Sequence, residues 1–310
     1  MATYDFDYSN LFESHLPVGV LHKFIINSFV KITPEFLSEA IFETHELNGL
    51  KNGIEYNIEK KPISISSRIT NKNQIIIYEN FCQFLWAFNY AVIVIYTEGI
   101  QKPREINKYV KTIDYKNVFN NRALALFIEG FKLFTNYTEK EFFRLPNPVK
   151  YNQFEKKYIE IANSAFLASI TYFLLHEFAH HYFHHIDCSC GDFKKEEFDC
   201  DDFAFDKFET RFNIEKETTY KVGLVTALAS LAFMDNTFKG GPDHPDPDLR
   251  LKRQLLKMNL RDIDNIWGIS CLAFELWSLA NKTQFEIPKN FKNYKELFDL
   301  IMDQINNLKQ

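Results

Sequence analysis

Residues 166–180 read FLASITYFLLHEFAH, and the architecture of the chain follows most directly from this stretch. The run is strongly apolar and contains neither Gly nor Pro, which predicts a continuous helix. It ends in the pattern His-Glu-x-x-His, formed by His176, Glu177 and His180. On a helix the two histidines lie on one face, about 6 Å apart along the axis.

Two imidazoles at this spacing can bind one Zn²⁺ at the usual distance of about 2.0–2.1 Å. Glu177 is displaced from them by about 100° around the helix, which suits a base acting on water rather than a ligand. The pattern therefore predicts a zinc site on His176 and His180. The alternative is a helix that carries two exposed histidines and a surface glutamate.

A catalytic zinc needs a third protein ligand and one open position. A three-histidine site would need Gly and His where the chain has Phe183 and Ile186, which excludes it. Glu197 followed four residues later by Asp201 fits a glutamate ligand, with Asp201 on the same helix face to accept the N–H of a ligand histidine. Glu196 remains a rival ligand, and the surrounding acidic run is alternatively a solvated face.

Residues 239–250 read KGGPDHPDPDLR and predict an irregular loop that leads into a helix. His244 in this loop is a candidate donor to the oxyanion of a tetrahedral intermediate. Arg250 is a candidate partner for carboxylates around the site, such as Asp201. A proline-rich surface turn with a capping aspartate is an equally good interpretation.

The rest of the chain predicts a mainly α fold with a small N-terminal β-sheet (α+β) and a zincin-like helical catalytic core. Two or three strands are expected between residues 54 and 79, and the break at Leu145-Pro-Asn-Pro148 separates an N-terminal α+β region, 1–148, from a helical region, 149–310. The two regions can also form one continuous domain. Helices are expected at residues 33–47, 81–96, 122–134, 152–185, 194–211, 217–235, 247–259, 265–281 and 293–308.

Composition narrows the possible functions. The 310 residues include 46% hydrophobic side chains and 32 Phe, which indicates an aromatic-packed globular protein. A net charge of −5 without a basic stripe makes nucleic acid a poor candidate partner. The apolar run 81–96 is shorter than the roughly 20 residues of a membrane span, and residues 1–8 lack the features of a signal peptide. Five cysteines fit reduced thiols, so a cytoplasmic protein is expected.

Three motifs resemble those of gluzincin metallopeptidases: HEFAH at 176–180, E-x-x-C-D-x-x-A at 197–204 and H-P-x-x-x-x-R at 244–250. Their order and spacing are similar to the family of CaaX-processing and heat-shock membrane peptidases. The chain departs from that family in having Cys200 where Ala is usual, and in lacking transmembrane helices.

A chain of this length with HEFAH more closely resembles the phage-exclusion Lit peptidase family, whose members cleave elongation factor Tu on phage infection and so stop translation. The resemblance covers about 35 residues around the zinc helix and about ten near His244. It implies a phage-defence peptidase, elongation factor Tu as the protein substrate and a phage-derived activator. It does not extend to the first 150 residues.

Further histidines crowd the same helix, and Cys188 and Cys190 follow it. A second Cys/His zinc site is an open alternative, although no second C-x-x-C half accompanies it. His184 would lie about 12 Å along a straight helix from His176, too far to share its metal. We interpret His184 and His185 as polar or partly packed side chains.

These patterns predict a zinc endopeptidase in which His176, His180 and Glu197 hold Zn²⁺. Glu177 takes a proton from the attacking water and passes it to the leaving amine. His244 stabilises the oxyanion. Two alternatives remain: a metal-dependent sensor or regulatory protein whose zinc helix is structural or works only with a partner, and a metal hydrolase that acts on a bond other than a peptide.

Overall fold

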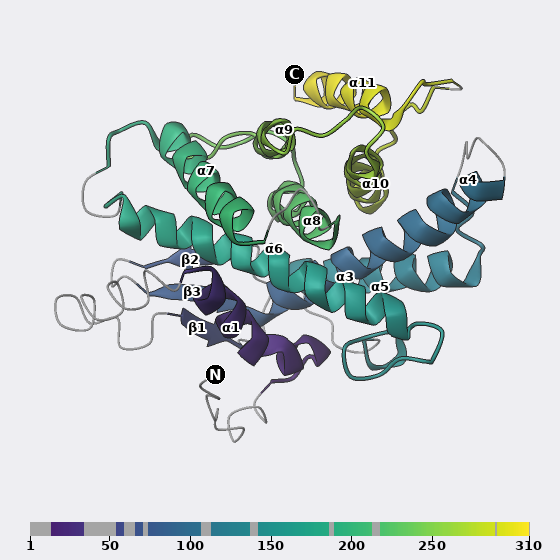
Figure 1. Ribbon diagram of the computed structural model, residues 1–310, viewed down its shortest axis with the longest axis horizontal. Coiled ribbons are helices and arrows are strands. Elements are labelled where there is room, and N and C mark those ends of the chain that lie inside the picture. Colours follow the sequence, from purple (N-terminus) through teal and green to yellow (C-terminus); the bar gives the residue numbers. More distant parts are fainter. Residues whose placement is uncertain are drawn as a thin grey trace.

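The computed structural model describes residues 14–33, 54–58, 66–70, 74–106, 113–136, 142–185, 189–212, 218–288 and 290–309 (Figure 1). It confirms a mainly helical fold with one small sheet near the N-terminus. Short helical turns occur at η2 (Pro17–Leu21), η3 (Tyr96–Gln101) and η4 (Phe142–Arg144). The α-helices are α1 (His22–Ile32), α3 (Glu79–Ile95), α4 (Lys102–Ile106), α5 (Val118–Asn136), α6 (Lys156–Tyr182), α7 (Phe193–Phe212), α8 (Thr218–Met234), α9 (Pro247–Lys257), α10 (Asn265–Ala280) and α11 (Tyr294–Leu308). The strands are β1 (Ile54–Asn57), β2 (Ser67–Ile69) and β3 (Ile75–Tyr78).

The sheet has the strand order β1-β3-β2, with β3 parallel to β1 and antiparallel to β2. All four side chains of β3 are buried, as expected for a central strand of consecutive isoleucines. β2 is an edge strand and packs against α6. The strands expected between residues 54 and 79 are therefore present, although residues 63–65, one of the stretches expected to alternate, lie outside the described residues.

Helix α3 forms the centre of the molecule, and every one of its residues is buried. It packs against α5, α6 and α8 (Figure 1). One of its buried amides, Asn89, has both ends satisfied: Nδ2 donates to Ser169 Oγ at 3.1 Å, and Oδ1 accepts from Thr226 Oγ1 at 2.8 Å. Because a buried polar group is costly only when it lacks partners, this network joins three helices without destabilising the core.

Helices α6 and α8 approach closely at Gly223. A Cβ at this position would lie 2.5 Å from the carbonyl oxygen of Ala165 and 2.6 Å from Ala168 Cβ. The glycine therefore allows α8 to lie directly on the helix that carries the His-Glu-x-x-His motif.

Gly223→Ala is expected to lower the free energy of unfolding by about 1–3 kcal/mol, because the helices must separate to admit the methyl group. Gly241→Ala is the matched control, since nothing lies within 4 Å of its added Cβ. Chemical denaturation of both variants measures the difference. Equal stabilities of the two variants would show that the close packing at Gly223 does not contribute to the free energy of unfolding.

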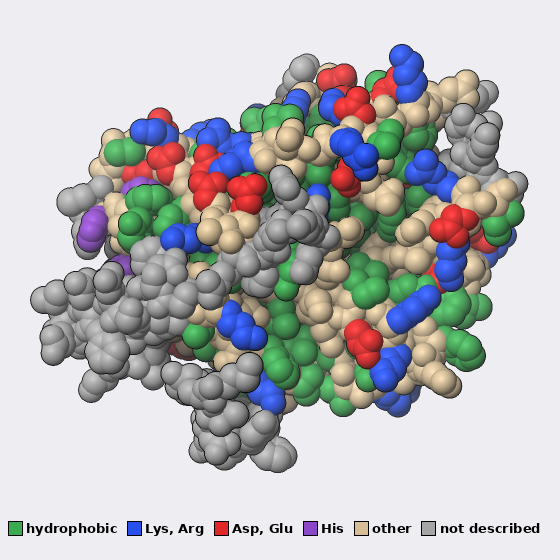
Figure 2. Space-filling view, in the orientation of Figure 1, with side chains coloured by type: hydrophobic (Ala, Val, Ile, Leu, Met, Phe, Trp, Pro, Cys, Tyr) green, Lys and Arg blue, Asp and Glu red, His purple; other side chains and the backbone are tan. Residues whose placement is uncertain are grey.

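Helix α6 is long and apolar enough to cross a membrane by length and composition alone. In the folded chain, however, 72% of its most apolar window is buried by other parts of the protein. Buried apolar side chains from both sides of the break at residues 145–148 form one continuous hydrophobic core. On the face in Figure 2, acidic and basic side chains are mixed over the described surface rather than gathered by sign.

Several expected helix boundaries differ from the structure by a few residues, and two of the differences have a clear local cause. α6 ends at Tyr182 instead of His185, because His184 adopts a left-handed conformation (φ 58°) that stops the helix. Thr33, expected to begin a helix, instead follows the last turn of α1, where its N–H and hydroxyl both donate to Phe29 O. The remainder of the helix expected at 33–47 lies outside the described residues.

Candidate active site

Helices α6 and α7 bring together the three residues that the sequence predicts as metal ligands. His176 Nε2 and His180 Nε2 lie 3.3 Å apart, as expected for neighbours on one helix face. His176 Nε2 is 3.3 Å from Glu197 Oε2, and His180 Nε2 is 3.3 Å from Glu197 Oε1. Two imidazole nitrogens from α6 and the carboxylate of one glutamate from α7 therefore lie together.

This geometry fits a zinc ion. In a tetrahedral site with metal–ligand distances of about 2.0–2.1 Å, neighbouring ligand atoms lie about 3.3 Å apart. Glu197 is buried, and its Oε2 has no hydrogen bond although Arg250 Nη1 lies 2.9 Å away. Besides this ion pair, the oxygen keeps a lone pair that can bind a cation between the histidines.

Asp201 and Arg250 fix the orientation of His176 through its other ring nitrogen, Nδ1. His176 Nδ1 lies 3.0 Å from Asp201 Oδ1, and Arg250 donates to both Asp201 oxygens at 2.7 Å. Tyr172, one helical turn before His176, adds a hydroxyl hydrogen bond to Asp201 Oδ1 at 3.0 Å. A carboxylate held by three donors leaves His176 with its Nδ1–H directed at Asp201 and its Nε2 free for a metal.

The electrostatics of this cluster are strongly coupled. Burial acts to lower the pKa of His176, but Glu197 and Asp201 outweigh it and raise the pKa to about 9. Burial also opposes the ionised form of Asp201, but Arg250 and His176 lower its pKa to about 2. In the metal-free protein a proton on His176 therefore supplies positive charge that a bound cation would otherwise supply.

Glu177 lies beside the histidines and is held by the edge strand. Ser67 Oγ donates to Glu177 Oε1 at 3.0 Å, and the backbone N–H of Ile69 donates to Oε2 at 2.9 Å. Because each carboxylate oxygen has a second lone pair, both can still accept a hydrogen bond from water. The two donors orient the carboxylate without blocking it.

His244 is also brought to the site. Its Nδ1 lies 3.2 Å from Glu197 Oε1, and two-thirds of its side chain (66%) is exposed. Its loop is tightly folded, since a Cβ on Gly240 would lie 2.4 Å from the carbonyl oxygen of His244. Asp246 fixes the loop further by accepting from Gly240 N and from Lys309 Nζ, both at 2.8 Å.

A cavity of about 710 Å³ is lined by His176, Glu177, His180, Glu197 and His244. One wall is the edge strand β2, and the other walls come from α6, α7 and the loop that carries His244. The rival ligand Glu196 also lines the cavity but is not grouped with the two histidines, and its Oε1 accepts from Ser189 Oγ and Cys190 N. The acidic run on α7 is therefore divided, with Glu197 and Asp201 at the candidate site and Asp202 in surface ion pairs with Arg253.

Three residues of the site escaped sequence analysis. Tyr172 precedes His176 by four residues, so helical periodicity alone would have placed it on the same face. Ser67 and Ile69 carry no such signal, because they lie more than 100 residues from Glu177 in sequence.

The site joins a His-Glu-x-x-His helix to a glutamate from a second helix, which is the arrangement that the motifs predict. Residues 75–270 match the model of the family Peptidase U49, which is the Lit protease family. The match covers more than half of the chain, which therefore belongs to this family and is a peptidase. The resemblance inferred from the three motifs is confirmed. Comparisons with curated proteins and with solved structures give no significant match.

Proposed function

We propose that the protein is a zinc-dependent endopeptidase. One observation carries the proposal: the Nε2 atoms of His176 and His180 lie 3.3 Å apart, each is 3.3 Å from an oxygen of the Glu197 carboxylate, and Glu177 lies beside them in the same cavity. Zinc held by these residues would supply an electrophile that polarises the scissile carbonyl and favours ionisation of water. Membership of a peptidase family supports the choice of an amide substrate.

In this proposal Glu177 is the general base and then the general acid. It accepts a proton from the attacking water and delivers it to the nitrogen of the leaving amine. Ser67 and Ile69 hold the carboxylate toward the cavity during both transfers. His244, exposed at the cavity next to Glu197, is the proposed donor to the oxyanion.

The edge strand supports a polypeptide substrate in an extended conformation. β2 lies at one side of the sheet and lines the cavity, so a substrate segment beside it would pass the histidines and Glu177. Backbone pairing with a sheet edge is a common way of binding extended peptides.

The biological target rests on the family resemblance. We propose a translation factor as the substrate, with elongation factor Tu as the first candidate, in a cytoplasmic defence against phage. A phage-derived activator is part of this proposal, because the Lit peptidases act on infection. The match to Peptidase U49 supports this choice of target at the level of the family.

Mapping of new protein termini tests the proposal. Wild type and Glu177→Gln are expressed in parallel, with and without phage infection, and new termini are identified by mass spectrometry. We expect termini that require the wild-type protein and infection, with one in elongation factor Tu. Identical sets of termini from the two proteins would overturn the peptidase function. New termini confined to other proteins would overturn only the proposed target.

A regulatory protein that is active only with a partner is the second candidate. The motifs leave this alternative open, and the two hydrogen bonds from β2 would orient Glu177 in the same way in both candidates. Purified protein separates the candidates. Chelator-sensitive cleavage without a partner indicates an autonomous peptidase, and cleavage that needs an added partner indicates the regulated form.

A further inference from the structure

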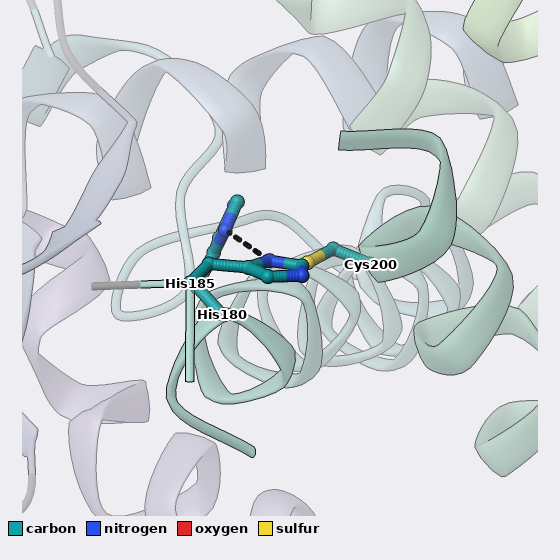
Figure 3. A group of neighbouring side chains, drawn as sticks. All are labelled: His180, His185 and Cys200. Atoms are coloured by element: carbon teal, nitrogen blue, oxygen red, sulfur yellow. Dashed lines mark hydrogen bonds between the residues drawn. The ribbon is translucent and has the colours of Figure 1, made fainter. Parts of the chain in front are cut away.

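A second group of side chains that could hold a metal ion includes His180 and two residues beside it, His185 and Cys200. Figure 3 shows His185 between His180 and Cys200, with the three side chains pointing toward one another. His185 Nδ1 is 3.3 Å from His180 Nδ1 and 3.6 Å from Cys200 Sγ. The ligand atoms of the three residues all lie within 4.8 Å of one another.

The turn after α6 places His185 in this position. His184 adopts a φ of 58°, a conformation usually taken by glycine at the end of a helix. The N–H of His185 then donates to His180 O at 2.9 Å, and the N–H of His184 donates to His181 O at 3.0 Å. This paired hydrogen-bond pattern reverses the chain, so His185 folds back over His180 instead of continuing along the helix.

Cys200 reaches the same point from α7. It lies three residues after Glu197, so one face of α7 directs the carboxylate to one side of His180 and the thiol to the other. Cys200 is fully buried, whereas His180 and His185 are partly exposed. His185 lines both the active-site cavity and a second hollow.

Hydrogen bonding alone does not account for the cluster. A ring nitrogen of a neutral histidine offers either one lone pair or one N–H, so His185 Nδ1 can satisfy His180 or Cys200 but not both. A tetrahedral zinc ion requires separations of about 3.3 Å between two nitrogen ligands and about 3.6 Å between nitrogen and sulfur. The distances at His185 match both values.

The local charge also favours a cation. The carboxylates of Glu196, Asp199 and Glu197 all act electrostatically on His185. The second hollow is lined by Asp199, Asp202 and Asp206 as well as by His185. A soft thiolate with two imidazoles is a ligand set suited to Zn²⁺ and related thiophilic metals.

We propose that His180 Nδ1, His185 Nδ1 and the Cys200 thiolate form a second site for a thiophilic divalent cation such as Zn²⁺. His180 would then use Nε2 for the first site and Nδ1 for the second. Loading the second site releases the proton of the Cys200 thiol and the remaining N–H proton of His180. Because two cations share one ring, the second is expected to bind more weakly than the first.

Cobalt titration of the full-length, metal-stripped protein tests this site without any activity measurement. A thiolate ligand gives Co²⁺ an intense near-ultraviolet charge-transfer band, and the first site contains no sulfur among its described ligands. We expect the band to appear with the second equivalent of Co²⁺. Cys200→Ser and His185→Ala should abolish the band and the second equivalent, but retain the first.

His184→Ala and the double variant Cys188→Ser/Cys190→Ser are the controls, and both should keep the band. Its loss in the double variant and persistence in Cys200→Ser would assign the sulfur to the other cysteines and overturn the proposal. Absence of the band at saturating Co²⁺ would also overturn it, leaving His185 as a hydrogen-bond partner of His180. His176→Ala removes a ligand of the first site but none of the second. Its cobalt band therefore tests the second site separately from the peptidase proposal.

Discussion

Glu177→Gln is expected to lower kcat for peptide hydrolysis by about 10²–10⁴-fold, the usual contribution of a general acid–base group. An amide has nearly the same size as the carboxylate and can still accept a hydrogen bond from Ser67 or Ile69. It cannot take a proton from water or return one to the leaving amine. The loss should therefore fall on catalysis, while His176 and His180 keep their positions.

Cleavage assays and metal analysis of the same preparations measure this result. Glu160→Gln is the matched control, because Glu160 lies on the same helix with an exposed side chain. We expect unchanged metal content in both variants and full activity in the control. Activity of Glu177→Gln within a few fold of wild type would show that another group moves the proton.

Arg250→Ala is expected to lower the free energy of unfolding of the metal-free protein by about 3–5 kcal/mol. Arg250 binds both oxygens of Asp201, which is fully buried, and lies 2.9 Å from a Glu197 oxygen. Its removal leaves two buried carboxylates, with a protonated His176 as the nearest remaining positive charge. An uncompensated buried charge costs far more than the lost contact itself, because the charge has already been taken out of water.

Arg253→Ala tests whether burial causes this effect. Arg253 pairs with Asp202 through the same helices, α9 and α7, but its side chain is 46% exposed and that of Asp202 is 27% exposed. Screening by solvent limits the contribution of such a pair to about 0–1 kcal/mol. Chemical denaturation should therefore separate the two variants clearly. Equal losses would mean that the buried cluster has no special role in stability.

Local sequence was sufficient for much of the fold. Helical patterns in the sequence predicted α3 and α6 to α11 to within a few residues of their observed bounds, and β-branched residues predicted the sheet. The same local rules grouped His176 with His180 and Glu197 with Asp201, because residues four apart share a helix face. They also failed locally at α6, where His184 was treated as one more helical residue although it ends the helix.

The motifs also gave Asp201 as one candidate partner of Arg250, and the structure displays this pair. The other contacts between elements were decided by tertiary packing. It set the edge strand against Glu177, folded His185 back onto His180 and directed Cys200 to the far side of that ring. The physical reason is that helical periodicity fixes only neighbours within one element. Contacts between elements depend on how whole surfaces pack, as at Gly223, and no short pattern encodes them.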